Sequence, residues 1–251
     1  MDCRWRIELA AARVKLLTPK MLLERMQGKD DSPLRALVGG VRDAPQRQRT
    51  LRDSIEWSYD LLNESDRILF ARLAVFRGGC PLEAIESICG EALPVPVFEG
   101  LESLVDKSLV QQKETTAGEP RYTLLEMIHE YASERLEASG EAVMLRRRHA
   151  EYFVALAEQA EPELRLARFD YWCERFEIDL DNIRAVLEWT LHDGEVSLGV
   201  RLAGALGIFW YGTGYHVEGG RWCERLLNRL DDVSVIYHPN FLITSGHMSM
   251  V

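Results

Sequence analysis

The sequence predicts a mostly α-helical protein, in which a winged helix with one β-hairpin wing is followed by an array of tetratricopeptide-like α-hairpins. Apolar residues recur at helical spacing over most of the 251 residues. Two short β-type runs flank a glycine-bearing turn near residue 118 and give the one strong hairpin signal. Beyond residue 124 the patterned segments are helical, which favours a solenoid of helix pairs.

Residues 1–47 are predicted to form a helical remnant and a linker. Residues 7–16 are rich in alanine and leucine and favour a helix. A Thr-Pro pair at 18–19 starts a second, short helix, because threonine caps helix N-termini and proline fits the first helical position. The glycines, prolines and mixed charges of 27–49 indicate a linker.

From residue 50 the apolar spacing predicts four helices. Asn63 ends the first helix and caps the second, with Asp66 completing a box-like pairing. A Gly-Gly pair ends the second helix, and a proline starts the third. The third and fourth helices are expected over 82–89 and 97–106.

A β-hairpin is predicted after these helices. Its strands are the runs 108–113 and 120–124, on either side of a polar turn that contains Gly118. Several helices followed by one hairpin is the chain order of a winged helix, in which the hairpin is the wing. We therefore assign a winged helix domain to residues 48–124.

Residues 125–230 are predicted to form the helical repeats. A strict period of 34 residues is not visible, so the repeats would be degenerate. The tail over 231–251 is unpatterned. The helices are expected at about 127–138 (with Gly140 behind its end), 141–159, 169–178, 180–192, 196–211 and 217–230.

The formal net charge of −10 argues against nucleic-acid binding by the chain as a whole, because phosphate contacts need clustered lysine and arginine. No apolar run is long enough to span a bilayer, and the first residues lack the apolar region of a signal peptide. Five scattered cysteines do not form a disulfide framework, and Cys80 and Cys89 are interpreted as separate buried thiols. The expected location is the cytoplasm.

The motifs of common enzymes are missing from the sequence. It contains neither the phosphate-binding GxxxxGK[ST] motif nor the GxSxG elbow of a catalytic serine. Carboxylate pairs such as Asp179 and Asp181 are interpreted as solvated helix ends. His129, His149 and His192 lie in predicted helices and are interpreted as packing residues. We therefore predict no enzyme and no catalytic, cofactor-binding or metal-binding residues.

Two groups of side chains are candidates for surface contacts. Arg146, Arg147 and Arg148 point in different directions around a helix, so we expect each to pair separately with a nearby carboxylate rather than to bind phosphate. Most aromatic residues of the last third are expected to lock helix pairs together, and those exposed on a concave surface would anchor a partner. The partner-binding candidates are Trp172, Trp189, Trp210, Tyr211 and Trp222.

Several segments together resemble one protein family. These are IELAAARVKLLTPKMLLERM at 7–26, LRDSIEWSYDLLNESDRILFARLAVFRGGC at 51–80 and RYTLLEMIHEYASERL at 121–136. They are similar to bacterial transcriptional regulators built on a STAND-type (NB-ARC-like) ATPase, including LuxR-type and SARP-type members. The resemblance implies the end of the ARC subdomain over 1–47, a winged helix and the first tetratricopeptide-like repeats. The ATPase core and the DNA-binding domain of that family have no counterpart here.

Two departures from the family pattern matter. Residues 1–6 replace the GLPLA-type motif, with Arg4 where the family has proline near the adenine, and we hypothesise that they are a frameshifted form of it. Plant and animal relatives carry Met-His-Asp at the position of Leu124-Leu125-Glu126, where the histidine senses the β-phosphate. This chain lacks that nucleotide sensor.

The resemblance implies a regulatory, interaction-making fragment of a STAND-type transcriptional regulator. Its winged helix would pack against the absent ATPase core, and its repeats would bind a protein partner or an inducer. No cofactor is expected in this chain, whereas the full-length family uses ATP or ADP. The alternative is a stand-alone DNA-binding winged helix, but its recognition helix at 97–106 carries Glu99, Glu102 and Asp106, which repel phosphates. We expect neither membrane association nor direct DNA binding.

Overall fold

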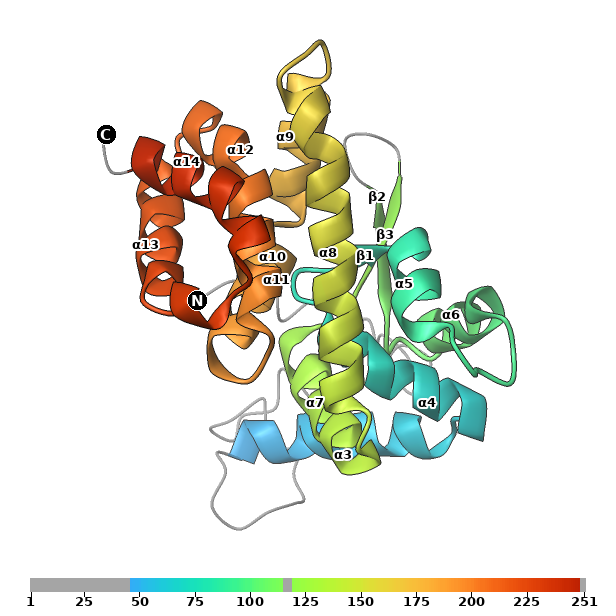
Figure 1. Ribbon diagram of the computed structural model, residues 1–251. Helices are drawn as coiled ribbons and strands as arrows, with labels where there is room; N and C mark the ends of the chain where they lie inside the picture. The colour runs from blue at the N-terminus through green and yellow to red at the C-terminus, as the bar shows by residue number, and fades with distance from the viewer. Residues whose placement is uncertain (1–45, 115–118, 249–251) are drawn as a thin grey trace, which may run out of the picture.

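The computed structural model describes residues 46–114 and 119–248 (Figure 1). The helices expected over 7–16 and from residue 18, and the departure at 1–6, lie outside these residues. The first described helix, α3 (Gln46–Asp60), begins inside the predicted linker, because the glutamines and arginines at its start are good helix formers that extend the amphipathic segment behind them.

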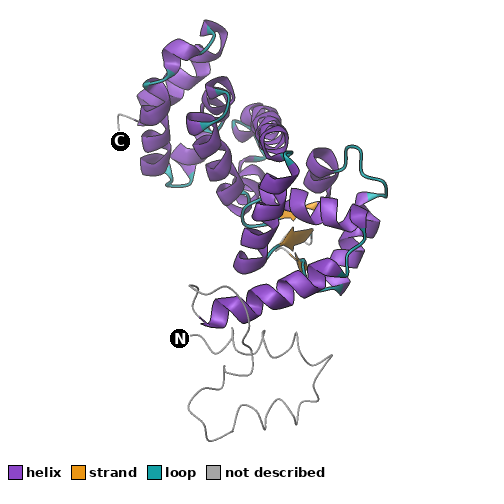
Figure 2. Ribbon diagram, turned by 90° about the horizontal axis from the view of Figure 1, so that it is seen from below, coloured by secondary structure: helices purple, strands orange, loops and turns teal. Residues whose placement is uncertain are grey.

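The winged helix has the predicted order of helices and hairpin. After α3 come α4 (Glu64–Arg72), a short 3₁₀ turn (Leu73–Val75), α5 (Leu82–Cys89) and α6 (Val97–Asp106), followed by the hairpin of β2 (Gln111–Glu114) and β3 (Pro120–Thr123). A two-residue strand that the sequence did not predict, β1 (Cys80–Pro81), pairs antiparallel with β3 and gives the sheet order β1-β3-β2. Figure 2 shows this small sheet enclosed by helices.

Local signals in the sequence set the ends of these elements. Asn63 caps α4, its side chain accepting a hydrogen bond of 2.8 Å from the Asp66 N–H. The predicted box is incomplete, since the Asp66 carboxylate accepts from Ser103 on α6 instead. Gly78 and Gly79 both have positive φ angles, which residues with a side chain rarely adopt, so the chain can reverse direction between α4 and β1.

Eight helices follow the hairpin within the described residues (Figure 1). The long helix α8 runs between the sheet and the array. The predicted helix over 196–211 is broken at Leu206, where α14 approaches so closely that a Cβ on Gly207 would lie 2.3 Å from Thr244 Oγ1. The helices are α7 (Glu126–Ser139), α8 (Ala142–Leu164), α9 (Phe169–Ile178), α10 (Leu180–His192), α11 (Val196–Ala205), α12 (Gly207–Gly212), α13 (His216–Leu227) and α14 (His238–Met248).

The unpatterned tail contains α14, which the sequence did not predict. Phe241 is fully buried, but the other side chains that α14 buries include Thr244 and Ser245, so no apolar period reveals the helix. Thr244 donates a hydrogen bond of 3.1 Å to the Gly204 carbonyl on α11. Small and polar residues thus bring the two helices together, and helical order extends to residue 248.

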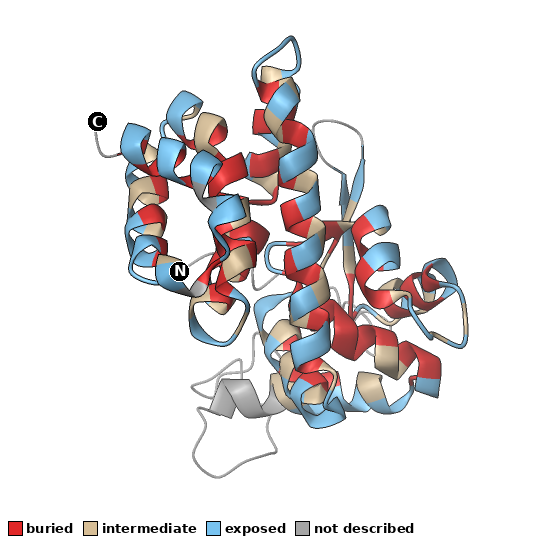
Figure 3. Ribbon diagram, in the orientation of Figure 1, coloured by how far each residue is buried: buried red, intermediate tan, exposed pale blue. Residues whose placement is uncertain are grey.

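Two hydrophobic cores hold the molecule, and α8 contributes to both (Figure 3). The first surrounds the sheet and also takes in Ile128 and Tyr131 of α7 and Leu145 at the start of α8. The second lies in the array and includes Phe153 further along α8. The core around the sheet thus extends past residue 124, while the domain division drawn from the sequence stays a prediction.

Within the described part of the chain, no helix combines the length and the apolar character that crossing a bilayer requires.

Candidate functional site

The last helix before the wing, α6, is the one that would face DNA. Its inner side buries Val97, Leu101 and Leu104. Gly100 lets it approach α4, because a Cβ there would lie 2.7 Å from Leu69 Cδ2. Its outer side exposes four residues, Phe98, Glu99, Glu102 and Asp106. This face therefore offers DNA one aromatic ring and three carboxylates.

The segment that contains α5 and α6 is predominantly negatively charged. Six residues in 82–107 are acidic and one is basic; these are Glu83, Glu86, Glu91, Glu99, Glu102, Asp106 and Lys107. Lys107 turns toward the protein, with Nζ donating to Ser103 Oγ at 2.6 Å and lying 4.0 Å from the carboxylate of buried Asp66. The basic residue that could contact a phosphate is thus already engaged.

The wing adds little positive charge within its described residues. Lys113 is exposed on β2 and lies opposite Arg121 in the hairpin register. Arg121 points back into the protein, where Nη2 donates to the Gly79 carbonyl at 2.8 Å and to Asp179 Oδ1 at 2.5 Å. Recognition of DNA by base edges and phosphates needs arginine, lysine or amide side chains on the presented surface. The described part of the wing presents one such cation.

Arg121 belongs to a polar joint, which we define as Gly79, Arg121, His149, Asp179 and Asn182. The joint connects the winged helix to α8 and α10 of the array. Asn182 is fully buried; its Nδ2 donates to the Gly79 carbonyl at 2.9 Å, and its Oδ1 lies 3.2 Å from His149 Nε2. Because Asp179 is only 1% exposed, its interpretation as a solvated helix end is wrong, whereas Asp181 is exposed as expected.

The family of winged helix-turn-helix domains matches residues 62–137, which cover α4, α5, α6, the hairpin and most of α7. The chain carries a winged helix-turn-helix domain. The matched range extends into α7, in agreement with the packing of that helix in the core around the sheet.

The chain is also similar to longer mycobacterial proteins. Those named "Putative HTH-type transcriptional regulator" in Mycobacterium tuberculosis and in Mycobacterium bovis are each 42% identical to it over 225 residues. The alignments cover 88% of this chain, which spans about a quarter (24%) of the length of those relatives. An uncharacterized protein of M. tuberculosis is 37% identical over 142 residues, covering 54% of this chain and 34% of that protein. No solved structure gives a significant match.

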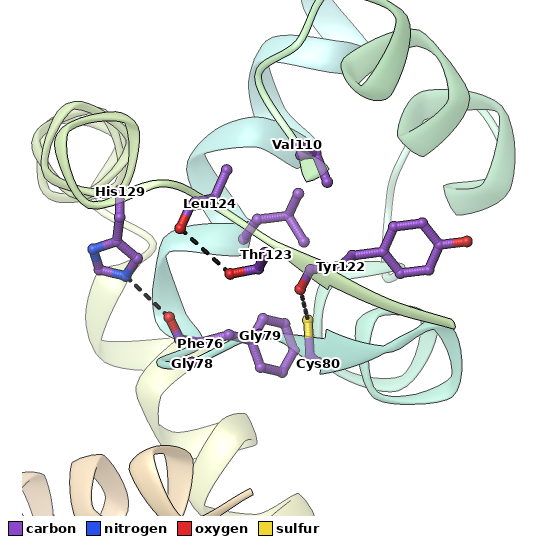
Figure 4. A pocket seen from close by; sticks show the side chains of 10 residues that line it. Phe76, Gly78, Gly79, Cys80, Val110, Tyr122, Thr123, Leu124 and His129 are labelled. Carbon is purple, nitrogen blue, oxygen red and sulfur yellow. Dashed lines mark hydrogen bonds between the residues drawn. The ribbon is translucent and has the colours of Figure 1, made fainter. Parts of the chain in front are cut away.

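A small cavity lies beside the winged helix-turn-helix sheet, between the Gly78-Gly79 turn, β3 and α7 (Figure 4). Its volume of about 20 Å³ admits a single water rather than a nucleotide. His129 closes one side, with Nε2 donating to the Phe76 carbonyl at 3.0 Å. Burial, and then the positive charge of Arg77, lower the pKa of His129. The histidine is therefore a neutral packing residue, as the sequence predicted.

We expect His149 to make the joint sensitive to pH. It is buried between Phe76 and Phe153, and burial lowers the pKa of its imidazole to about 4. In the unfolded chain the histidine binds a proton near pH 6.5. The unfolded state therefore binds more protons between these two values, and the stability that neutral His149 contributes above pH 6.5 is lost as the pH falls toward 4.

We expect the free energy of unfolding to fall by about 2–3 kcal/mol between pH 7 and pH 4.5 through His149 alone. Urea unfolding at these pH values measures the change. The control is His149→Gln, whose amide can keep a hydrogen bond to Asn182 but does not titrate. An equally steep pH dependence in this variant would show that other groups carry the effect.

The arginine cluster on α8 pairs as the sequence predicted. Arg146 contacts Glu137, and Arg148 contacts Glu91. Arg147 lies 3.0 Å from two carboxylates, those of Glu151 and Glu195. Each guanidinium therefore has its own carboxylate partner, and the three do not form a phosphate site.

The cysteines of the described residues are free thiols. Cys80 and Cys89 are both buried and unbonded to each other, which confirms their interpretation. Burial raises the pKa of Cys89 to about 12, so the sulfur stays protonated and is a poor nucleophile. The described residues also contain no group of three or more side chains that could hold a metal ion.

The aromatic candidates for partner binding do not form one surface. Trp172 and Trp210 are buried in the core of the array, at 3% and 1% exposure. Trp189 and Trp222 are half-buried against the same core. Tyr211 is 64% exposed and can be reached by a partner without rearrangement. A role in partner binding stays a prediction for all five residues, with Tyr211 the most accessible.

Proposed function

We propose that this chain is a regulatory, interaction-making segment of a transcriptional regulator, whose winged helix-turn-helix domain binds protein rather than DNA. The observation that carries the proposal is the outer face of α6, where Glu99, Glu102 and Asp106 stand exposed, while the adjacent Lys107 is turned toward Ser103 and the buried Asp66. DNA carries a phosphate charge about every 1.7 Å of its axis, so a face with three carboxylates is repelled.

The proposal extends to the kind of regulator. The resemblance to STAND-type ATPase regulators supports a role in which the winged helix packs on an ATPase core and the helical repeats receive a protein partner or an inducer. Leu125, at the position of the nucleotide-sensing histidine of plant and animal relatives, is 41% exposed at the start of α7. An exposed apolar side chain there favours contact with another protein surface over contact with a phosphate.

Direct DNA binding is the alternative function. It is considered because the relatives are named as HTH-type transcriptional regulators. Against it, Lys107 is paired with Ser103 and Asp66, and Arg121 is bound in the joint. A DNA-binding face would therefore have to form without the basic side chains of α6 and β3. We place DNA recognition in the parts of the relatives that this chain does not cover.

Fluorescence anisotropy with a labelled random 30-base-pair duplex tests the proposal. At 50 mM salt we expect no saturable binding of the chain below roughly 100 µM, the weak end of non-specific binding. A matched control is the triple variant Glu99→Arg, Glu102→Arg and Asp106→Arg, which should gain affinity that falls with added salt. Submicromolar binding by the unmodified chain, weakening steeply with salt, would overturn the proposal.

A further inference from the structure

The helical array contains a cavity of about 330 Å³. It opens between α8, α11 and the segment that leads into α14. Its size falls at the lower end of the range that small-molecule sites occupy in proteins. The cavity lies away from the polar joint and from the face of α6, so neither of these features explains it.

One part of the cavity is apolar. Val200 and Ala205 of α11 are buried there, and Ile236 stands 73% exposed at its edge. Gly204 lies between them, where a Cβ would meet the Phe241 backbone nitrogen at 3.1 Å. The backbone of α14 therefore rests on α11, and the cavity remains open beside this contact.

The cavity is also lined by two carboxylates, Glu158 and Glu161, of which only Glu158 is tightly paired with an arginine. Arg201 binds both oxygens of Glu158, at 2.7 and 2.8 Å, and its guanidinium carbon lies 5.4 Å from the centroid of the Tyr237 ring. Such a two-point contact is a strong, charge-assisted pairing that occupies both partners. Glu158 and Arg201 thus cancel, and neither is readily available to a ligand.

Glu161, one helical turn further along α8, is held loosely. Asn240 Nδ2 lies 3.3 and 3.5 Å from its two oxygens, and a guanidinium nitrogen of Arg165 lies 3.6 Å from one of them. Charge-assisted hydrogen bonds are usually 2.7–2.9 Å long. The Glu161 side chain is 23% exposed, so a ligand that enters the cavity can reach a carboxylate whose present contacts are weak.

We propose that this cavity binds a small organic cation, an amine or guanidine carried on a short apolar chain. The cation would sit on Glu161, and the apolar chain would lie against the exposed side chain of Ile236. An anion fits less well, because Arg201 is already paired and the protein carries a net charge of −10. The proposal rests on the binding role proposed above for the helical repeats, and it names a ligand class for them.

Isothermal titration calorimetry of the full chain at pH 7, with n-hexylamine as the probe, tests the site. We expect saturable binding at millimolar concentrations or below, at least tenfold tighter than that of uncharged 1-hexanol. Glu161→Gln should weaken the binding of hexylamine at least tenfold. The control Glu224→Gln removes the same charge from an exposed position on α13 that does not line the cavity, and it should leave the affinity unchanged.

Three results would overturn the cation site: no saturable binding of hexylamine, equal binding of hexanol, or unchanged affinity in Glu161→Gln. Circular dichroism of the variant confirms that it is folded before the comparison is made. Failure here leaves the anisotropy experiment with DNA untouched, since that experiment depends on α6 and not on the cavity. The two proposals can therefore fail separately.

Discussion

Replacement of Asn182 by leucine is expected to lower the free energy of unfolding by about 3–5 kcal/mol. Asn182 lies on α10 and is completely buried. Its Oδ1 accepts a hydrogen bond of 2.7 Å from the Arg77 N–H, and its Nδ2 donates one of 2.9 Å to the Gly79 carbonyl. The same Oδ1 lies 3.2 Å from His149 Nε2.

Leucine has a similar volume but leaves the Arg77 N–H and His149 Nε2 without a partner, while the Gly79 carbonyl keeps only its hydrogen bond from Arg121. Each unsatisfied buried donor or acceptor costs about 1–3 kcal/mol, and access of water to the Gly78-Gly79 turn would recover part of that cost. The change also cuts a direct hydrogen-bonded connection between the winged helix and the array. We therefore expect a loss of cooperativity between the two cores as well as a loss of stability.

Urea unfolding followed by circular dichroism and by tryptophan fluorescence measures both effects. Among the tryptophans in the described residues, Trp57 lies in α3 and the other four in the array, so fluorescence reports mainly on the array. The control Asn228→Leu changes an exposed residue behind α13 and should cost no more than about 0.5 kcal/mol. A loss below about 1 kcal/mol in Asn182→Leu would show that the joint contributes little.

Local chemistry made much of the winged helix predictable. The bounds predicted for α5 and α6 agree with the structure, because a proline precedes each helix and the apolar spacing continues to its end. Gly140 ends α7 in the left-handed conformation, as expected of a glycine behind a helix. β1 was not predictable, because it has two residues and is defined only by its pairing with Tyr122 and Arg121, about forty residues away.

The polar joint was not predictable from the sequence either, because its contacts join residues that are far apart along the chain. Asp179 and Asn182 are ordinary residues for the start of a helix, and nothing near them in sequence indicates burial. Their partners lie far along the chain: Arg121 is 58 residues from Asp179, and Gly79 is 103 residues from Asn182. By contrast, the acidic character of α6 was visible directly, because helical spacing alone decides which of its residues face outward.

Replacement of Arg72 by methionine is expected to cost about 3–5 kcal/mol, because two backbone carbonyls and a carboxylate lose their hydrogen-bond donor. Arg72 lies in the last turn of α4 and is 4% exposed. Its Nη1 donates to the Cys89 and Glu91 carbonyls at 2.8 and 2.6 Å. Its Nε and Nη2 donate to the two Glu141 oxygens at 3.0 and 2.6 Å. One side chain thus joins α4, the end of α5 and the start of α8.

Methionine fills much of the space but donates no hydrogen bonds. The Glu141 carboxylate is 30% exposed and can regain water, so most of the cost should come from the carbonyls of Cys89 and Glu91. Arg72→Lys should restore only part of the stability, because an ammonium group cannot reproduce the planar, five-donor geometry of a guanidinium. Urea unfolding of both variants measures the losses, with Arg221→Met on the exposed side of α13 as a control that should change little.

A double-mutant cycle with Glu141→Gln separates the two kinds of contact. If the ion pair dominates, the loss caused by Arg72→Met should shrink strongly in the Glu141→Gln background. If the carbonyl contacts dominate, as the exposure of Glu141 indicates, most of the loss should remain in that background. A loss within about 0.5 kcal/mol of zero in both backgrounds would contradict the assignment of Arg72 as the connection between α4, α5 and α8.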